Sequence, residues 1–112
     1  MVSAVTRDEV GRLSEELAAL AEPHRLLMLR HLRRGPRSAG YLAEAVGMPQ
    51  PLAAYHLSVL LEAGLITKRR KGQFSCYAAD RERVRELHQR IGRLVGASGA
   101  VSERRPVADD PC

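Results

Sequence analysis

The longest run of consecutive basic residues in this sequence, Lys68 to Lys71, is chemically suited to binding phosphate groups. Lysine supplies a point charge, and the planar guanidinium groups of Arg69 and Arg70 each match two phosphate oxygens at once. The whole chain carries a formal net charge of +5, so an acidic partner is expected. A basic run alone is often only a solvated surface, so its meaning depends on the element that carries it.

Two thiols are the next residues with distinctive chemistry, Cys76 and Cys112. They lie far apart and form no CxxC pattern, which argues against a disulfide scaffold and against a zinc finger. The simplest interpretation of Cys76 is a small buried hydrophobe. As an alternative, Cys112 could reach Cys76 of its own or a partner subunit through a long tail. The pair would then form a disulfide or a two-thiolate site for arsenite or an organoarsenical.

The histidines share no spacing typical of metal ligands, such as HxxxH. They are His24, His31, His56 and His88. A metal site would require the fold to bring them together, and a lone histidine on a helix is more often structural or solvated. We therefore predict no metal site and no cofactor. The sequence also lacks a nucleophile motif, a glycine-rich phosphate loop and paired carboxylates in a pocket-forming context, so we predict that the protein is not an enzyme.

Length and composition indicate one globular domain, because the chain has 112 residues of which 45% are hydrophobic. We divide it into a folded domain, residues 1–97, and a flexible tail, residues 98–112, which is rich in Ser, Gly, Pro and charged residues. No stretch reaches the ~18 apolar residues of a membrane span, and the first residues lack a secretory signal pattern. We therefore expect a cytoplasmic protein.

Apolar spacing and caps predict three helices in the first half of the chain. Thr6 and Glu9 form a capping box for a helix over about residues 7–21. Pro23 suits the first turn of a second helix, and Ser38 can cap a short third helix that Gly47 ends. The inward residues of the second and third helices are predicted to be Leu26, Leu29, Leu32, Leu42, Ala45 and Val46.

A fourth helix over residues 51–63 is followed by two short strands, residues 65–70 and 73–79. Lys71 and Gly72 between the strands have the size and chemistry of a hairpin turn. On the fourth helix, helical spacing places Ala53, Leu57 and Leu60 on one face and Ala54, Tyr55 and Ser58 on the other. Asp80 caps a last helix.

The predicted fold is mainly α with a small β-hairpin, in the order helix, helix, helix, helix, strand, strand, helix. This order is that of a winged helix-turn-helix, in which the second helix of the pair enters the major groove of DNA and the hairpin lies across the neighbouring backbone. In this fold the basic residues Lys68 to Lys71 lie on the wing hairpin, where they are predicted to contact DNA phosphates. The predicted DNA-binding residues are Gln50, Ala54, Tyr55, His56, Ser58, Lys68, Arg69, Arg70, Lys71 and Gln73.

Narrow apolar stripes on the first and last predicted helices favour association with a second copy of the chain, because so small a domain cannot bury every stripe itself. The stripes consist of Val10, Leu13, Leu17 and Leu20, and of Val84, Leu87, Ile91 and Leu94.

Three segments of the sequence also resemble the ArsR/SmtB family of bacterial repressors, "LAEPHRLLMLRHL", "YLAEAVGMPQPLAAYHLSVLLEAGLI" and "RKGQFSCYAAD". The resemblance covers about residues 17–80. It implies a homodimer joined through its first and last helices, which binds operator DNA near a promoter and lets go when an effector binds.

The sequence departs from that family in two places, at the start of the DNA-reading helix and at the metal-sensing sites. Pro49 stands where the family usually has a serine, so side-chain capping is lost, and Ala54 replaces a common serine. Ser38 and Gly40 stand where arsenic, cadmium and lead sensors have a Cys-x-Cys pair. The positions that align with the zinc and cobalt ligands are Arg81, Arg83, Leu94 and Ala97, and none of these binds such metals.

Three explanations of regulation therefore stay open: a thiol-linked signal, a small organic ligand, or constitutive binding without any ligand. A winged-helix module that binds protein through the same surface is the alternative function.

Overall fold

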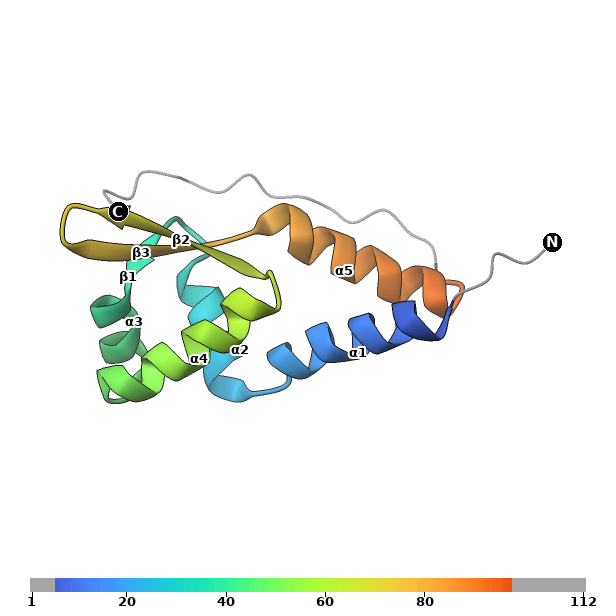
Figure 1. The fold of residues 1–112 in the computed structure, drawn as a ribbon, viewed down its shortest axis with the longest axis horizontal. Helices are drawn as coiled ribbons and strands as arrows, with labels where there is room; N and C mark the ends of the chain where they lie inside the picture. The colour runs from blue at the N-terminus through green and yellow to red at the C-terminus, as the bar shows by residue number, and fades with distance from the viewer. Residues whose placement is uncertain (1–5, 98–112) are drawn as a thin grey trace.

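The computed structural model describes residues 6–97, and the predicted order of helices and strands is confirmed there, with one further short strand, β1, between the second and third helices (Figure 1). Cys112 and the rest of the predicted tail lie outside the described residues. The elements are α1 (Arg7–Leu20), α2 (Pro23–His31), β1 (Arg37–Ser38), α3 (Ala39–Val46), α4 (Gln50–Glu62), β2 (Ile66–Lys71), β3 (Phe74–Ala79) and α5 (Arg81–Leu94). No helix in this part of the chain is both long and apolar enough to span a membrane.

Side-chain caps begin four of the five helices, as local sequence chemistry requires. The Thr6 and Glu9 capping box at the start of α1 is present in both directions. Ser38 accepts a hydrogen bond from the Tyr41 N–H at α3, and Asp80 accepts one from Arg83 at α5. The cap of α2 is Glu22, whose side chain accepts from the Arg25 N–H.

Helix α4 begins differently, between two prolines. Pro49 is the cap residue and makes no side-chain hydrogen bond to the helix, which confirms the loss of side-chain capping. Pro51 occupies the first turn, where its missing N–H has no intrahelical partner in any case. The backbone carbonyl of Pro49 instead accepts from Leu52 and Ala53 at 3.1 and 3.0 Å.

The sheet has three antiparallel strands in the order β1-β3-β2. The sequence did not predict β1, because two residues are too few to show alternation. The β2–β3 turn also lies one residue further along than predicted, at Gly72 and Gln73, and Lys71 pairs with Phe74 as the last residue of β2. Gly72 has a φ of 61°, a conformation that favours glycine at the first position of a two-residue hairpin turn.

The apolar core lies between the helices and the inner face of the sheet. It comprises Leu13, Ala19, Met28, Leu32, Leu42, Ala43, Ala53, Leu57, Leu60, Leu65, Ile66, Tyr77 and Leu87. Two predicted inward positions are wrong: Leu26 is exposed while Met28 is fully buried, and Ala45 is exposed while Ala43 is buried. On α2, Met28 and Leu32 lie one helical turn apart on the same face, and Leu26 lies about 200° around the helix from Met28.

Helices α1 and α5 run side by side and extend away from the sheet and the helix-turn-helix as an arm (Figure 1). Glu16 on α1 joins them through ion pairs with Arg90 at 2.7 Å and Arg83 at 3.6 Å. The Arg83 guanidinium also packs against Gly64, which follows α4 with a φ of 78°. A Cβ there would lie 2.6 Å from Arg83 Nη2 and would displace the flexible end of that side chain, and the positive φ itself favours glycine.

Candidate nucleic-acid interface

The outward face of α4 carries most of the side chains predicted to meet DNA. Gln50, Ala54, Tyr55 and Ser58 are exposed, while Ala53, Leu57 and Leu60 are buried beneath them, so the predicted division of the helix is confirmed. Tyr55 has 57% of its surface exposed, so part of its ring and its hydroxyl can contact a partner although the ring also meets the His56 ring edge-on. The Ser58 hydroxyl donates to the Tyr55 carbonyl at 2.7 Å, so part of its hydrogen-bonding capacity is already used within the helix.

His56 does not join this surface, although the sequence analysis included it among the DNA-binding candidates. It is only 7% exposed and turns inward, toward the start of α2. The reason is its position on the helix, because it lies next to Leu57 and one turn from Ala53 and Leu60, on the edge of the buried face. We therefore remove His56 from the set of candidate DNA contacts.

The wing presents its cations on both faces of the β2–β3 hairpin. Lys68 and Arg70 share a face with Tyr77 and Ser75, their partners in the register, and the Lys68 ammonium lies 5.8 Å from the centre of the Tyr77 ring. The alternation of strand side chains places Arg69 and Lys71 on the opposite face. All four cations and Gln73 at the tip are exposed. Phe74 beside the tip is also exposed, which the sequence analysis missed.

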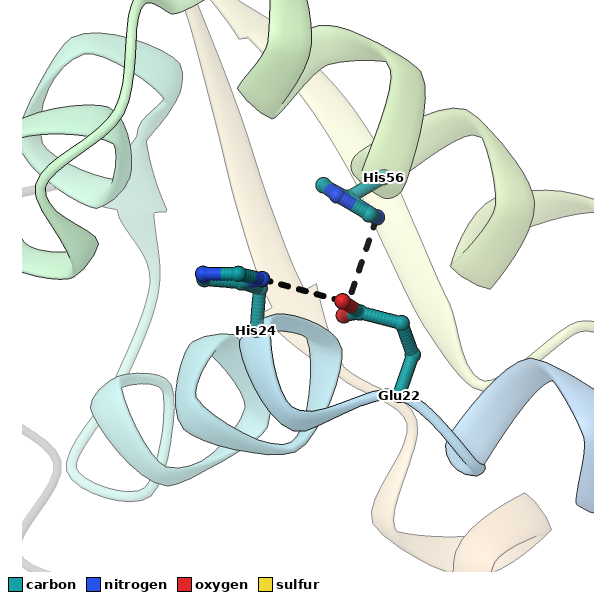
Figure 2. Close-up of side chains that lie close together, drawn as sticks. All are labelled: Glu22, His24 and His56. Carbon is teal, nitrogen blue, oxygen red and sulfur yellow. Dashed lines mark hydrogen bonds and ion pairs between the residues drawn. The ribbon is translucent and has the colours of Figure 1, made fainter.

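A polar cluster lies behind α4, and its members are too far apart in the chain for a sequence pattern to indicate it. Glu22 and His24 belong to the start of α2, and both point toward His56 on α4 (Figure 2). His24 Nδ1 lies 2.9 Å from Glu22 Oε2, and His56 Nδ1 lies 3.9 Å from Glu22 Oε1. Arg25 completes the cluster, with Nη1 3.1 Å from His56 Nδ1 and Nε donating to the Ala19 carbonyl at 2.6 Å.

The hydrogen bond between His24 and Glu22 is the main reason that the pKa of Glu22 falls from its ordinary 4.5 to about 2, and bonds from the Arg25 and His24 backbone add to the effect. A carboxylate with a lowered pKa stabilises the fold fully above about pH 4.5, and this contribution is lost as the pH falls toward 2. We therefore expect the stability difference between the wild type and Glu22→Gln to shrink as the pH falls below about 4.5, measured by urea unfolding. A difference that stays unchanged down to the lowest pH would contradict this account.

The residues predicted to form a dimer interface fall into buried, partly buried and exposed ones in the structure. On each arm helix part of the apolar stripe packs within the protomer and part stays exposed. Leu13 and Leu87 are buried in the protomer's own core. Leu20, Val84 and Ile91 pack partly against that core. The exposed candidates are Val10, Leu17 and Leu94.

Cys76 lies in the central strand of the sheet, opposite Ser38 on one side and Arg69 on the other. Only 4% of its surface is exposed, in agreement with the interpretation of a small buried residue. Cys76 is also disulfide-bonded, so in this state it is not available as a free thiol.

Comparison with known proteins places the chain among bacterial regulators. A helix-turn-helix domain model matches residues 20–69. The chain is 38% identical over 84 residues to the arsenical resistance operon repressor of Bacillus subtilis, a match that covers 73% of this chain and 80% of that protein. It is 34% identical to a probable mercury resistance operon repressor of Streptomyces lividans, over 75% of this chain but only 66% of that protein's length.

A solved structure agrees with these matches. The solution structure of the homodimeric winged helix-turn-helix DNA-binding domain Mb0332 from Mycobacterium bovis, a possible ArsR-family regulator, is similar to this chain with a TM-score of 0.67 and 28% identity. The similarity covers 86% of this chain and 91% of that one.

Proposed function

Because this chain belongs to the ArsR/SmtB family of helix-turn-helix transcriptional regulators, a non-enzymatic family, we propose that it is a sequence-specific repressor that binds operator DNA. In this proposal α4 enters the major groove and the wing contacts the flanking backbone. Side chains on α4 read base edges, and the wing cations fix register without reading sequence.

The observation that carries the proposal is the shared exposure of the outer face of α4 and of the wing. Gln50 and Tyr55 are solvent-exposed on α4, whose opposite face is buried in the core. The cations of β2 are exposed on the hairpin that follows α4 in the chain. Within the protomer the Tyr55 ring makes an edge contact with the His56 ring, and 57% of its surface stays exposed. It can stack on a base or contact a thymine methyl group.

We propose that the protein acts as a homodimer whose protomers meet through the arm. The exposed side chains of Val10, Leu17 and Leu94 support this, since an apolar stripe on a small domain favours a partner. The similarity to a homodimeric domain supports it as well. Two copies would present two α4 helices to half-sites one helical turn apart.

The experiment that tests the repressor function is fluorescence anisotropy with DNA from upstream of the protein's own gene, with an unrelated duplex of equal length as the reference. We expect specific binding at physiological salt. We also expect Tyr55→Ala to reduce the affinity for the specific duplex about ten- to a hundredfold, as loss of a base contact does. The affinity for the unrelated duplex should change little.

Leu52→Ala is the matched control, because Leu52 is also exposed on α4 but was not among the predicted contacts. Equal weakening by both variants would contradict base reading by Tyr55. Absence of any specific DNA affinity would favour the protein-interaction module instead.

We propose that an effector releases the protein from DNA. One candidate is a thiol-linked signal through Cys76 and Cys112, and a response of the reduced protein to arsenite or peroxide should then disappear in Cys76→Ser.

A further inference from the structure

We propose that Glu22, His24 and His56 form a binding site for a divalent transition-metal ion of the zinc, cobalt or nickel class. The side chains converge from the start of α2 and the middle of α4, as Figure 2 shows. One ligand atom from each residue lies within 4.8 Å of the others, and no other such group of three or more occurs within residues 6–97.

The chemistry of the donors selects the class of metal. Two imidazoles and one carboxylate form a set that zinc uses in three-ligand sites with an open fourth position. Imidazole nitrogen also suits cobalt and nickel, whereas the absence of sulfur disfavours soft ions and the two nitrogens disfavour magnesium and calcium.

The distances come close to what a bound ion needs. A tetrahedral ion with bonds of about 2.0–2.2 Å separates its ligand atoms by roughly 3.3–3.6 Å. Oε2 of Glu22 lies 2.9 Å from Nδ1 of His24, and Oε1 of Glu22 lies 3.9 Å from Nδ1 of His56. With one ligand atom from each residue, the three atoms all lie within 4.8 Å of one another. The two histidine rings are already stacked, with centroids 5.8 Å apart and planes inclined by 30°. Shifts of about 1 Å, within the reach of side-chain rotation, therefore bring the three atoms onto one ion.

The burial of the ligands provides both an anchor and an entrance. The His56 side chain is 9% exposed, that of Glu22 is 26% exposed and that of His24 is 48% exposed. An ion can enter past His24 and keep a water on the solvent side as its fourth ligand. The firmly packed His56 restricts the geometry from within.

Arg25 is the internal competitor for this site. Its Nη1 lies 3.1 Å from Nδ1 of His56, the nitrogen that faces Glu22, so an ion must displace this contact. Two other hydrogen bonds of Arg25, from Nε to the Ala19 carbonyl and from its backbone N–H to Glu22, do not involve Nδ1 of His56. We therefore expect Arg25 to weaken metal binding. In Arg25→Met the affinity for cobalt should rise, provided that the variant folds.

Cobalt is the best probe, because tetrahedral Co²⁺ absorbs visible light and its spectrum reports its ligands. We expect the full chain, purified without a histidine tag, to develop the bands of a tetrahedral nitrogen and oxygen site at one equivalent, which zinc then bleaches. Glu22→Gln and His24→Ala should each lower the cobalt affinity by about a hundredfold or more, since even loss of an outer-shell group often reduces affinity 10–100-fold.

These two variants keep the fold testable, because Gln can still cap α2 and the His24 side chain is half exposed. His88→Ala is the matched control, an exposed histidine of α5 outside the cluster, and should leave the titration unchanged. Circular dichroism verifies the fold of each variant. A titration without absorbance change, or one that the two cluster variants do not alter, overturns the proposal, as does an intense thiolate-to-cobalt band that Cys112→Ser removes.

A bound ion would connect α2 to the inner side of the helix that carries Tyr55, so it would act as an effector of DNA affinity. That consequence rests on the proposed function. Cobalt binding is read without DNA, and DNA binding of the metal-free protein is read without cobalt, so failure of one is distinguishable from failure of the other. A cobalt-bound protein whose DNA affinity equals that of the metal-free protein would confirm the site and overturn its effector role.

Discussion

Replacing Arg69 and Arg70 by glutamine lowers the affinity for duplex DNA about ten- to a hundredfold and flattens its dependence on salt. The two residues point to opposite faces of β2, so the pair removes a phosphate contact whichever face of the wing meets the backbone. One or two charge-assisted contacts of about 1.5 kcal/mol each account for the loss. The slope of log affinity against log salt should fall by about 0.9 for each phosphate released.

Anisotropy titrations at several salt concentrations measure both quantities, on specific and unrelated duplexes. Because phosphate contacts carry no sequence information, the loss should be similar on the two. The control is Arg7→Gln with Arg93→Gln, which removes the same charge from exposed positions at the far end of the arm (Figure 1). An equal loss in the control would attribute the effect to net charge and not to the wing.

Leu60→Ala lowers the free energy of unfolding by about 2–5 kcal/mol. Leu60 is fully buried on the inner side of α4, so truncation leaves a cavity between the DNA-reading helix and the rest of the core. A domain of this size is stabilised by only about 5–15 kcal/mol, so the change is a large fraction of the total.

Urea unfolding followed by circular dichroism measures this change, at one fixed protein concentration because self-association adds to apparent stability. The control is Leu52→Ala, the same substitution on the same helix at a side chain that is 45% exposed. We expect it to change stability by less than about 1 kcal/mol. Similar losses in the two variants would contradict the burial of α4 described above.

Local patterns were sufficient for much of the fold. The capping box at Thr6, the cap at Ser38 and the glycine after α3 each act within a few residues, so their effect is visible in the sequence. The α4 stripe was predictable because its apolar residues recur with the helical period. The inner face of α2 was not, because four of its nine residues are Leu or Met and tertiary contacts decide which of them is buried.

The candidate site, too, was predictable only in part from the sequence. The wing and the outward face of α4 follow from charge order and helical spacing. The polar cluster does not, because Glu22 and His56 are separated by 34 positions and meet only after α2 packs against α4. His56 illustrates the limit: helical spacing puts it at the edge of the buried face, and its contacts with Arg25 and Glu22 cannot be read from that spacing.

The two prolines at the start of α4 have a kinetic consequence. Pro49 and Pro51 hold two φ angles of the helix-turn-helix near values suited to the turn and to the first helical turn, and Pro49 has a φ of −62°. This segment therefore has little disorder to lose when a duplex arrives. Association should proceed without a local folding step, at a rate set by diffusion and charge attraction, and the lifetime of the complex should then distinguish one DNA sequence from another.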